Sequence, residues 1–239
     1  MKKKILLVHG WNYNNYTNMT AETDAWHNRK NFVSALEQKY EVYKLNLPGF
    51  CGEAEPINSS GWKLDDFAKY INNHLTKNKL NVDYILGYSF GGPVLVRWKT
   101  MFSQNTKLIL VSPAIIRSSN NSKTFIQTPR LLTPIRNYLR NQYIIHIVKT
   151  KEMVHGTKFL CNTYQIIARD DLRLELQTID PNDISLVLGD KDTQISPQKL
   201  YDSLDDNFKS TVHFINGGGH DIATTHTEKV VKVIDSITK

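Results

Sequence analysis

One short stretch of the chain joins an apolar, strand-like run to an apolar, helix-like run with almost no residues between them. Residues 82–86 read as a buried strand and residues 93–102 as a helix, so the chain must reverse within residues 87–92. This turn has the pattern Gly-Tyr-Ser-Phe-Gly, with Ser89 at its centre. Glycines are needed where strand and helix backbones approach closely, and a serine at such a turn projects from the edge of the sheet. Ser89 is therefore a candidate nucleophile.

The GxSxG pattern alone is a weak signal, since chance produces it in roughly one chain of this length in ten or twenty. Its context is more demanding, because the motif must follow a strand and open a helix, as it does here. A nucleophilic serine also needs a base, an acid and donors for the negative charge that develops during attack. These groups must come from other loops of the chain.

Strand-like and helix-like segments alternate on both sides of this turn. Further strands are predicted at residues 4–8, 41–45, 107–111, 184–188 and 211–215, and helices after Asp24, over residues 64–75, after Ser196 and through residues 230–234. Asp24 and Ser196 are the predicted N-caps of two of these helices. Apolar strands alternating with helices indicate a parallel sheet covered on both faces, with ligands at the carboxyl ends of the strands.

Residues 115–180 interrupt this alternation. Two apolar stripes with helical spacing run over residues 131–147 and 159–167. We therefore expect an α/β core formed by residues 1–114 and 181–239, with residues 115–180 inserted as a helical cap, or lid, over Ser89. Aromatic and aliphatic residues of this cap would line an apolar acyl pocket.

The formal net charge of +7 is concentrated in the same insertion, which holds ten Lys or Arg against five Asp or Glu, or +5 of that total. The basic residues are dispersed and are not interleaved with aromatic residues, which favours solvated helix faces over a nucleic-acid surface. An anionic substrate, such as a thioester on a carrier, is the alternative interpretation. We expect no nucleic-acid partner.

Two features bear on the cellular location. No stretch approaches the roughly 20 apolar residues of a membrane span, and the apolar run near the N-terminus stops at His9, too early for a secretory signal. Cys51 and Cys161 lie far apart, without metal-ligand spacing, so we expect reduced thiols and no metal site. The prediction is a cytoplasmic protein without membrane insertion.

Two loops that follow predicted strands carry the groups that Ser89 lacks. The loop at residues 189–197 contains Asp190 and Asp192, and three glycines precede His220 after the last strand. An imidazole can take the serine proton, and a buried carboxylate can hold that imidazole in the required tautomer. Each residue also has a structural interpretation, since aspartates often only shape turns and a histidine can simply start a helix.

The order Ser89, Asp192, His220 and the surrounding loops resemble the α/β-hydrolase fold superfamily, and in particular its small lidded esterases and carbon-carbon hydrolases. The resemblance covers nearly the whole chain and rests on residues 9–11, 47–49, 87–91, 189–197 and 219–220. Many members have two strands before the first one here, so about six parallel strands are expected. The loop at residues 12–23 is longer than usual in the superfamily.

The resemblance also implies roles for individual residues. It assigns catalysis to Ser89, Asp192 and His220, with Asp190 as the less favoured acid. It implies an oxyanion hole formed by the backbone N–H groups of Trp11 and Phe90, which would contact the substrate together with residues of the cap. His9 is then expected to shape this hole rather than to transfer protons.

The pattern and the resemblance together predict a serine hydrolase. It would cleave carboxylic ester or thioester bonds of small to medium acyl substrates through an acyl-enzyme on Ser89, without a metal or organic cofactor. Carbon-carbon bond hydrolysis and acyl transfer are alternatives for the same triad. A non-catalytic, ligand-binding protein of this fold is a further alternative. The expected partner is a small-molecule acyl substrate.

Overall fold

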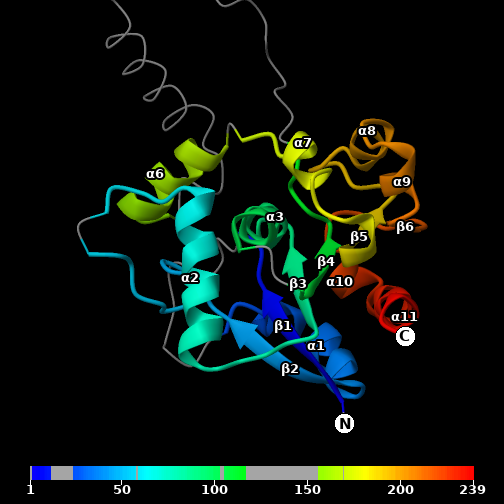
Figure 1. The fold of residues 1–239 in the computed structure, drawn as a ribbon, viewed down its shortest axis with the longest axis horizontal. Coiled ribbons are helices and arrows are strands. Elements are labelled where there is room, and N and C mark those ends of the chain that lie inside the picture. The colour runs from blue at the N-terminus through cyan, green and yellow to red at the C-terminus, as the bar shows by residue number, and fades with distance from the viewer. Residues whose placement is uncertain (1, 12–23, 58, 103–104, 117–155, 169) are drawn as a thin grey trace, which may run out of the picture.

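A six-stranded sheet forms the centre of the molecule. The computed structural model describes residues 2–11, 24–57, 59–102, 105–116, 156–168 and 170–239. All strand pairs are parallel, in the order β2-β1-β3-β4-β5-β6 (Figure 1). The strands are β1 (Lys3–Val8), β2 (Tyr40–Leu45), β3 (Tyr84–Tyr88), β4 (Lys107–Val111), β5 (Ile184–Gly189) and β6 (Val212–Ile215). The predicted α/β fold with about six parallel strands is confirmed.

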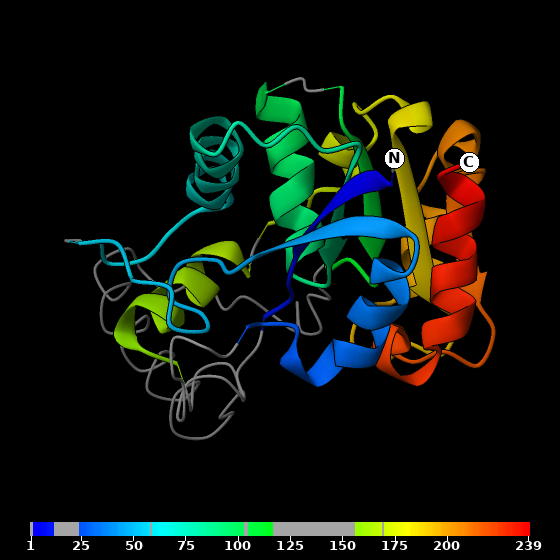
Figure 2. The same ribbon diagram turned by 90° about the horizontal axis from the view of Figure 1, so that it is seen from below.

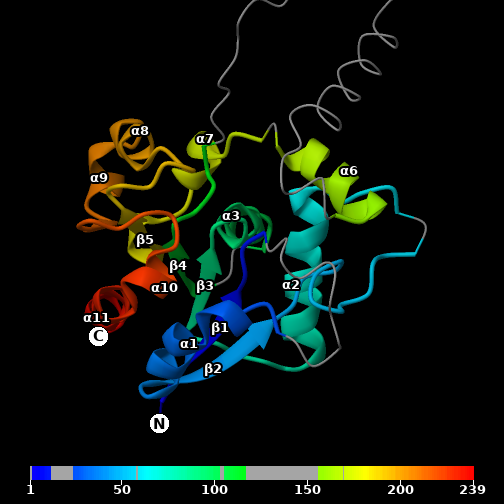
Figure 3. The same ribbon diagram turned by 180° about the vertical axis from the view of Figure 1, so that it is seen from behind.

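Helices cover both faces of the sheet, as Figures 2 and 3 show. On one face α2 (Leu64–Lys77) packs against α3 (Gly91–Phe102), and on the other α1 (Lys30–Glu37) packs against α11 (Thr227–Ile237). Each helix turns an apolar stripe inward, because burying that stripe removes it from water. The shorter elements are η2 (His27–Arg29), α6 (Lys158–Ile167), α7 (Arg173–Leu176), η5 (Pro181–Asp183), α8 (Pro197–Asp202), α9 (Asp206–Lys209) and α10 (Ile222–Thr225).

The strand order places a topological switch point beside the serine turn. β1 pairs with β2 on one side and with β3 on the other. The chain therefore moves to one side of β1 to form β2 and then crosses to the other side to form β3. In open parallel sheets the loops separate at such a point and leave a crevice at the carboxyl ends of the strands. The segments after β1 and β3 therefore lie at the switch point. Across the described part of the chain, every helix is too short or too polar to cross a bilayer.

Of the two predicted helix caps, Asp24 was wrong and Ser196 is confirmed as the residue that precedes its helix. Asp24 accepts a hydrogen bond on Oδ1 from the N–H of Trp26 (2.8 Å), whereas α1 begins only at Lys30, after η2. The carboxylate thus closes a turn of its own, which aspartate does readily with an N–H two residues ahead. Ser196 does precede α8, with Pro197 at its first position as predicted, but its side chain makes no capping hydrogen bond.

Only part of the predicted cap lies among the described residues. The second apolar stripe forms α6, and Phe159, Leu160 and Ile167 of this helix are buried. This helix docks on the loop before α2, since Thr163 Oγ1 accepts a hydrogen bond from the N–H of Trp62 (2.9 Å). The first stripe, at residues 131–147, falls outside the described residues, as do most of the basic side chains. The division into core and cap stays a prediction.

The glycines of the serine turn let three backbones meet. A Cβ atom on Gly91 would lie 2.4 Å from the carbonyl oxygen of Val8, and one on Gly87 would lie 2.7 Å from the carbonyl oxygen of Gly91. Such distances are far inside van der Waals contact, and the opposing atoms are backbone. The close approach expected from the sequence is therefore present.

We expect Gly91→Ala to lower the free energy of unfolding by about 1–3 kcal/mol, because the added methyl group forces β1 and α3 apart. Gly219→Ala is the matched control, since a Cβ atom there would have no neighbour within 4 Å. The control should change stability by less than about 0.5 kcal/mol. Urea unfolding followed by circular dichroism measures both, and equal stabilities for the two variants would contradict this packing.

Candidate active site

Ser89 lies directly after β3, in the turn that leads into α3. Its φ of 49° is in the left-handed region, which a serine seldom adopts. The Ser89 N–H donates to the carbonyl oxygen of Val111 (2.9 Å), and its own carbonyl oxygen accepts from the N–H groups of Gly92 and Ala114 (both 3.0 Å). These three hydrogen bonds hold the turn in a conformation that would otherwise be unfavourable.

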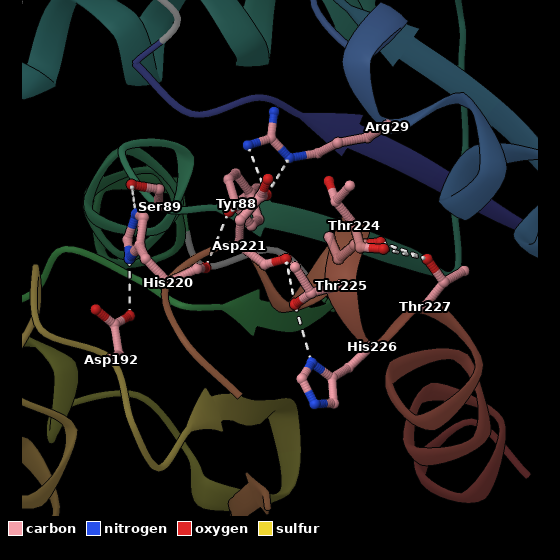
Figure 4. A network of polar contacts seen from close by, with 11 residues as sticks. Arg29, Tyr88, Ser89, Asp192, His220, Asp221, Thr224, Thr225, His226 and Thr227 are labelled. Carbon is pink, nitrogen blue, oxygen red and sulfur yellow. Dashed lines mark hydrogen bonds and ion pairs between the residues drawn. The ribbon is translucent and has the colours of Figure 1, made fainter. Parts of the chain in front are cut away.

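A continuous hydrogen-bonded row joins three loops at the carboxyl edge of the sheet (Figure 4). His220 Nε2 lies 3.0 Å from Ser89 Oγ, and His220 Nδ1 lies 2.7 Å from Asp192 Oδ2. A carboxylate only accepts hydrogen bonds, so Nδ1 carries the ring proton and Nε2 is left to accept the serine O–H. The ring is thus in the tautomer that can remove a proton from Ser89.

Asp192 is held more firmly than a loop aspartate usually is. Its side chain is 0% exposed, and its Oδ1 accepts hydrogen bonds from the N–H groups of Gln194 (2.8 Å) and Ile195 (3.1 Å). Asp190, the alternative acid, is exposed, and its Oδ1 instead accepts from the N–H of Gly217 (2.8 Å). The structure therefore places Asp192 against the imidazole and uses Asp190 to tie the two loops together.

Two backbone donors flank residues at the serine: Phe90 follows Ser89, and Trp11 follows Gly10, where a Cβ atom would lie 3.1 Å from Ser89 Cβ. Among the described residues, the N–H groups of Trp11 and Phe90 donate to no other protein atom. The N–H of Phe90 directly precedes α3, where amides are unpaired and the helix dipole favours negative charge. Phe90 as a whole is 1% exposed, and its ring packs against Trp11, Phe50 and Phe67, so we expect its predicted contact with the substrate to come from the backbone N–H.

The Trp11 side chain joins the loop after β1 to α6. Its ring makes edge contacts with the rings of Phe50, Phe90 and Tyr164, at centroid distances of 5.0, 5.2 and 5.4 Å. Such edge-to-face pairs stabilise beyond the area that they bury. Tyr164 belongs to α6, so this cluster fixes the position of Trp11 relative to that helix.

His9 connects the loops after β1 and β2. It is 2% exposed, its Nδ1–H donates to the carbonyl oxygen of Gly10 (2.7 Å), and its Nε2 accepts from the N–H of Leu47 (3.0 Å). Burial lowers the pKa of His9 to about 4, although the hydrogen bond to Gly10 acts in the opposite direction. A neutral imidazole that bridges two backbones orients the loop carrying Trp11. Its geometry fits the structural role expected for it.

We expect His9 to make stability depend on pH. Its pKa is lower in the folded protein (about 4) than its ordinary value of 6.5, so protonation favours unfolding. Its contribution is present above pH 6.5 and is lost as the pH falls towards 4, by about 3 kcal/mol in all. Urea unfolding at pH 7 and pH 4 should show a smaller loss for His9→Gln than for the wild type. Equal losses would contradict the assignment.

Three residues next to the row of Ser89, His220 and Asp192 were not recognised from the sequence. Arg29 donates to Asp221 Oδ1 from Nε (3.0 Å) and Nη2 (2.8 Å), and Tyr88 Oη lies 2.8 Å from the same oxygen. Tyr88 precedes Ser89 and Asp221 follows His220, so sequence adjacency could have suggested these two. No motif points to Arg29, which meets Asp221 only in the folded chain. The described residues contain no cluster of three or more His, Cys, Asp or Glu suited to a metal ion.

Solved structures with similar folds cover almost the whole chain. They include a bromoperoxidase from Bacillus anthracis (TM-score 0.66, 15% identity, 100% of this chain and 92% of that chain). A meta-cleavage product hydrolase from Pseudomonas fluorescens has a TM-score of 0.67 at 18% identity, over 99% of this chain and 90% of that chain. An esterase from Exiguobacterium antarcticum has a TM-score of 0.64 at 16% identity, over 99% and 92%. At these identities the likeness shows a shared fold.

Sequence comparisons identify the family directly. No curated protein matches the sequence significantly. The family model described as alpha/beta hydrolase fold matches residues 3–128, which is more than half of the 239 residues. This match includes residues 9–11 and the serine turn at residues 87–92, and the six-stranded parallel sheet agrees with it. The chain belongs to the alpha/beta hydrolase fold family.

Proposed function

We propose that the protein is a serine hydrolase that cleaves carboxylic ester or thioester bonds of small to medium acyl substrates. The observation that carries the proposal is the row from Ser89 Oγ through His220 to Asp192, with distances of 3.0 and 2.7 Å. Nucleophile and base lie within hydrogen-bond reach, and the base is oriented by a third group. The strained backbone of Ser89 supports the same role, since such strain is concentrated at functional sites.

The first half of the reaction forms an acyl-enzyme. His220 Nε2 takes the proton of Ser89 as Oγ attacks the carbonyl carbon, and Asp192 stabilises the imidazolium that results. The carbonyl oxygen becomes negative and accepts hydrogen bonds from the N–H groups of Trp11 and Phe90. Removing one such donor typically costs about 3–4 kcal/mol of transition-state stabilisation. The imidazolium then gives its proton to the leaving alcohol or thiol as the bond to the carbonyl carbon breaks.

The second half releases the acid. Water gives a proton to His220 Nε2 and attacks the acyl carbon, and the same backbone donors stabilise the second tetrahedral intermediate. The proton then passes to Ser89 Oγ as the bond between Oγ and the carbon breaks, which regenerates the serine. Every proton moves along the one row of side chains, so the chemistry that we propose requires no cofactor.

A substrate panel tests the proposal. We expect turnover of p-nitrophenyl esters with short to medium acyl chains, or of the matching coenzyme A thioesters, with release of the free acid. Turnover of a vinylogous diketone alone would instead favour carbon-carbon bond hydrolysis, and turnover only with an acceptor alcohol would favour acyl transfer. Ligand binding without any turnover would favour a non-catalytic protein and would contradict the proposal.

A further inference from the structure

We propose that Arg29, Tyr88 and Asp221 form a positioning network that holds the His220 loop in register with the Ser89 turn. The inference rests on the proposed function, because it assigns a purpose to contacts around the hydrolytic row. None of the three residues belongs to that row. They act through the backbone of His220 and through the side chain of Asp221, which follows it (Figure 4).

Tyr88 links the two loops directly. It is the last residue of β3 and is 2% exposed, and its Oη lies 3.0 Å from the carbonyl oxygen of His220 and 2.8 Å from Asp221 Oδ1. Its single O–H proton is shared between these two acceptors. The ring centroids of Tyr88 and His220 are 6.0 Å apart. The residue before the nucleophile therefore also contacts the residue that carries the base.

Arg29 closes the network from a third part of the chain. Its guanidinium lies 4.2 Å from the centroid of the Tyr88 ring and donates two hydrogen bonds to Asp221 Oδ1. Cations favour the face of an aromatic ring, particularly where they are shielded from water, and only 18% of the Arg29 side chain is exposed. Arg29 thus clamps the ring of Tyr88 and the carboxylate of Asp221 together.

The protonation states of the network are fixed by its surroundings. Burial would raise the pKa of Asp221, but the Arg29 charge and the hydrogen bond from Tyr88 outweigh it and hold that pKa below its usual value. Burial raises the pKa of Tyr88 well above its usual value, against the effect of Arg29. Near neutral pH the phenol therefore stays a donor and the carboxylate stays an acceptor.

The loop that carries His220 needs such a constraint. It begins with the three glycines at residues 217–219, and glycine restricts the backbone less than any other residue. A Cβ atom on Gly219 would have no neighbour within 4 Å, so no side chain packs against that side of Gly219. A misplacement of about 1 Å in a reacting group can cost about 100-fold in rate. Gly217 and Gly218 are held by backbone hydrogen bonds to Asp190, Ile215 and Lys191, and the contacts of Tyr88 with His220 and Asp221 hold the residues that follow them.

The decisive variant is Tyr88→Phe, with Tyr84→Phe as its matched control. Tyr84 is the first residue of β3, is 8% exposed, and donates its O–H to the carbonyl oxygen of Thr238 (3.2 Å) at the opposite edge of the sheet. Both variants remove one hydroxyl group from a buried tyrosine of the same strand. Any general effect on stability should therefore be similar in the two.

We expect Tyr88→Phe to lower kcat for a p-nitrophenyl ester by about 10-fold to 100-fold, with KM changed less than about 3-fold. The rate of inactivation by a fluorophosphonate should fall by a similar factor. Hydrogen exchange over residues 216–222 should become faster in Tyr88→Phe but not in Tyr84→Phe. Asp221→Asn keeps an oxygen acceptor, so it should retain more activity than Asp221→Ala.

Two outcomes would overturn the network. One is a Tyr88→Phe variant whose kcat and whose hydrogen-exchange rate over residues 216–222 both equal those of the wild type. The other is an equal loss in Tyr84→Phe, which would show a general effect of removing a buried hydroxyl group. Absence of turnover and labelling in the wild type would instead contradict the proposed function, while the exchange comparison would still decide whether Tyr88 orders the loop.

Discussion

Replacing Ser89 with alanine should lower kcat for an ester substrate by about 10⁴-fold or more, because the acyl-enzyme that we propose forms on Ser89 Oγ. The substitution removes one oxygen atom at a half-buried position and keeps the hydrogen bonds that the Ser89 backbone makes with Val111, Gly92 and Ala114. The fold should therefore survive. Initial rates of p-nitrophenol release, with circular dichroism of the same samples, measure both effects.

Ser112 provides a closely matched control for this experiment. It directly follows β4, adjacent to β3 in the sheet, and its φ of 46° is nearly the same as the 49° of Ser89. Its side-chain oxygen is buried and has no hydrogen-bond partner in the described structure. Ser112→Ala should therefore keep kcat within a few-fold of the wild type. An equal loss in both variants would show that disturbance of this edge of the sheet, and not loss of a nucleophile, abolishes activity.

Asp192→Asn should lower kcat by about 10⁴-fold with little change in KM, because an amide N–H facing His220 Nδ1 favours the wrong tautomer. The asparagine oxygen can still accept the two hydrogen bonds that Asp192 receives from the N–H groups of Gln194 and Ile195, so the loop should persist. Steady-state kinetics on a p-nitrophenyl ester measures the loss, and thermal unfolding checks that the variant is folded.

Asp190→Asn is the control for the acid. The carboxylate of Asp190 accepts a hydrogen bond from the N–H of Gly217, which an asparagine oxygen can also accept. Asp190 is exposed, and the hydrogen bond of His220 Nδ1 is made to Asp192. We expect the kcat of Asp190→Asn to stay within a few-fold of the wild-type value. A large loss in Asp190→Asn, or none in Asp192→Asn, would contradict the assignment of the acid.

The sequence was most informative where local chemistry decides the structure. The apolar run, the glycines and the serine of residues 82–102 predicted a strand, a tight turn and a helix. The structure has β3 at Tyr84–Tyr88 and α3 at Gly91–Phe102. The boundaries moved by two residues because apolar content marks burial, whereas strands and helices end where backbone hydrogen bonding ends. Parallel strands could likewise be inferred from alternation alone.

The contacts that sequence could not predict join distant parts of the chain. Arg29 and Asp221 are 192 residues apart, and their ion pair depends on how η2 and α1 pack against α10 and α11. Periodicity reports which face of an element is buried, but it does not report what lies opposite that face. Asp24 shows a second limit, since its carboxylate could serve a helix or a turn, and the turn was formed.

The most direct test of the proposed function is the position of a covalent adduct. The wild type, Ser89→Ala and Ser112→Ala would be treated with a fluorophosphonate, and intact-mass and peptide mass spectrometry would follow the label. We predict a single adduct on Ser89 in the wild type and in Ser112→Ala, and none in Ser89→Ala. An adduct on another residue, or equal labelling of the wild type and Ser89→Ala, would contradict the assignment of Ser89 as the nucleophile.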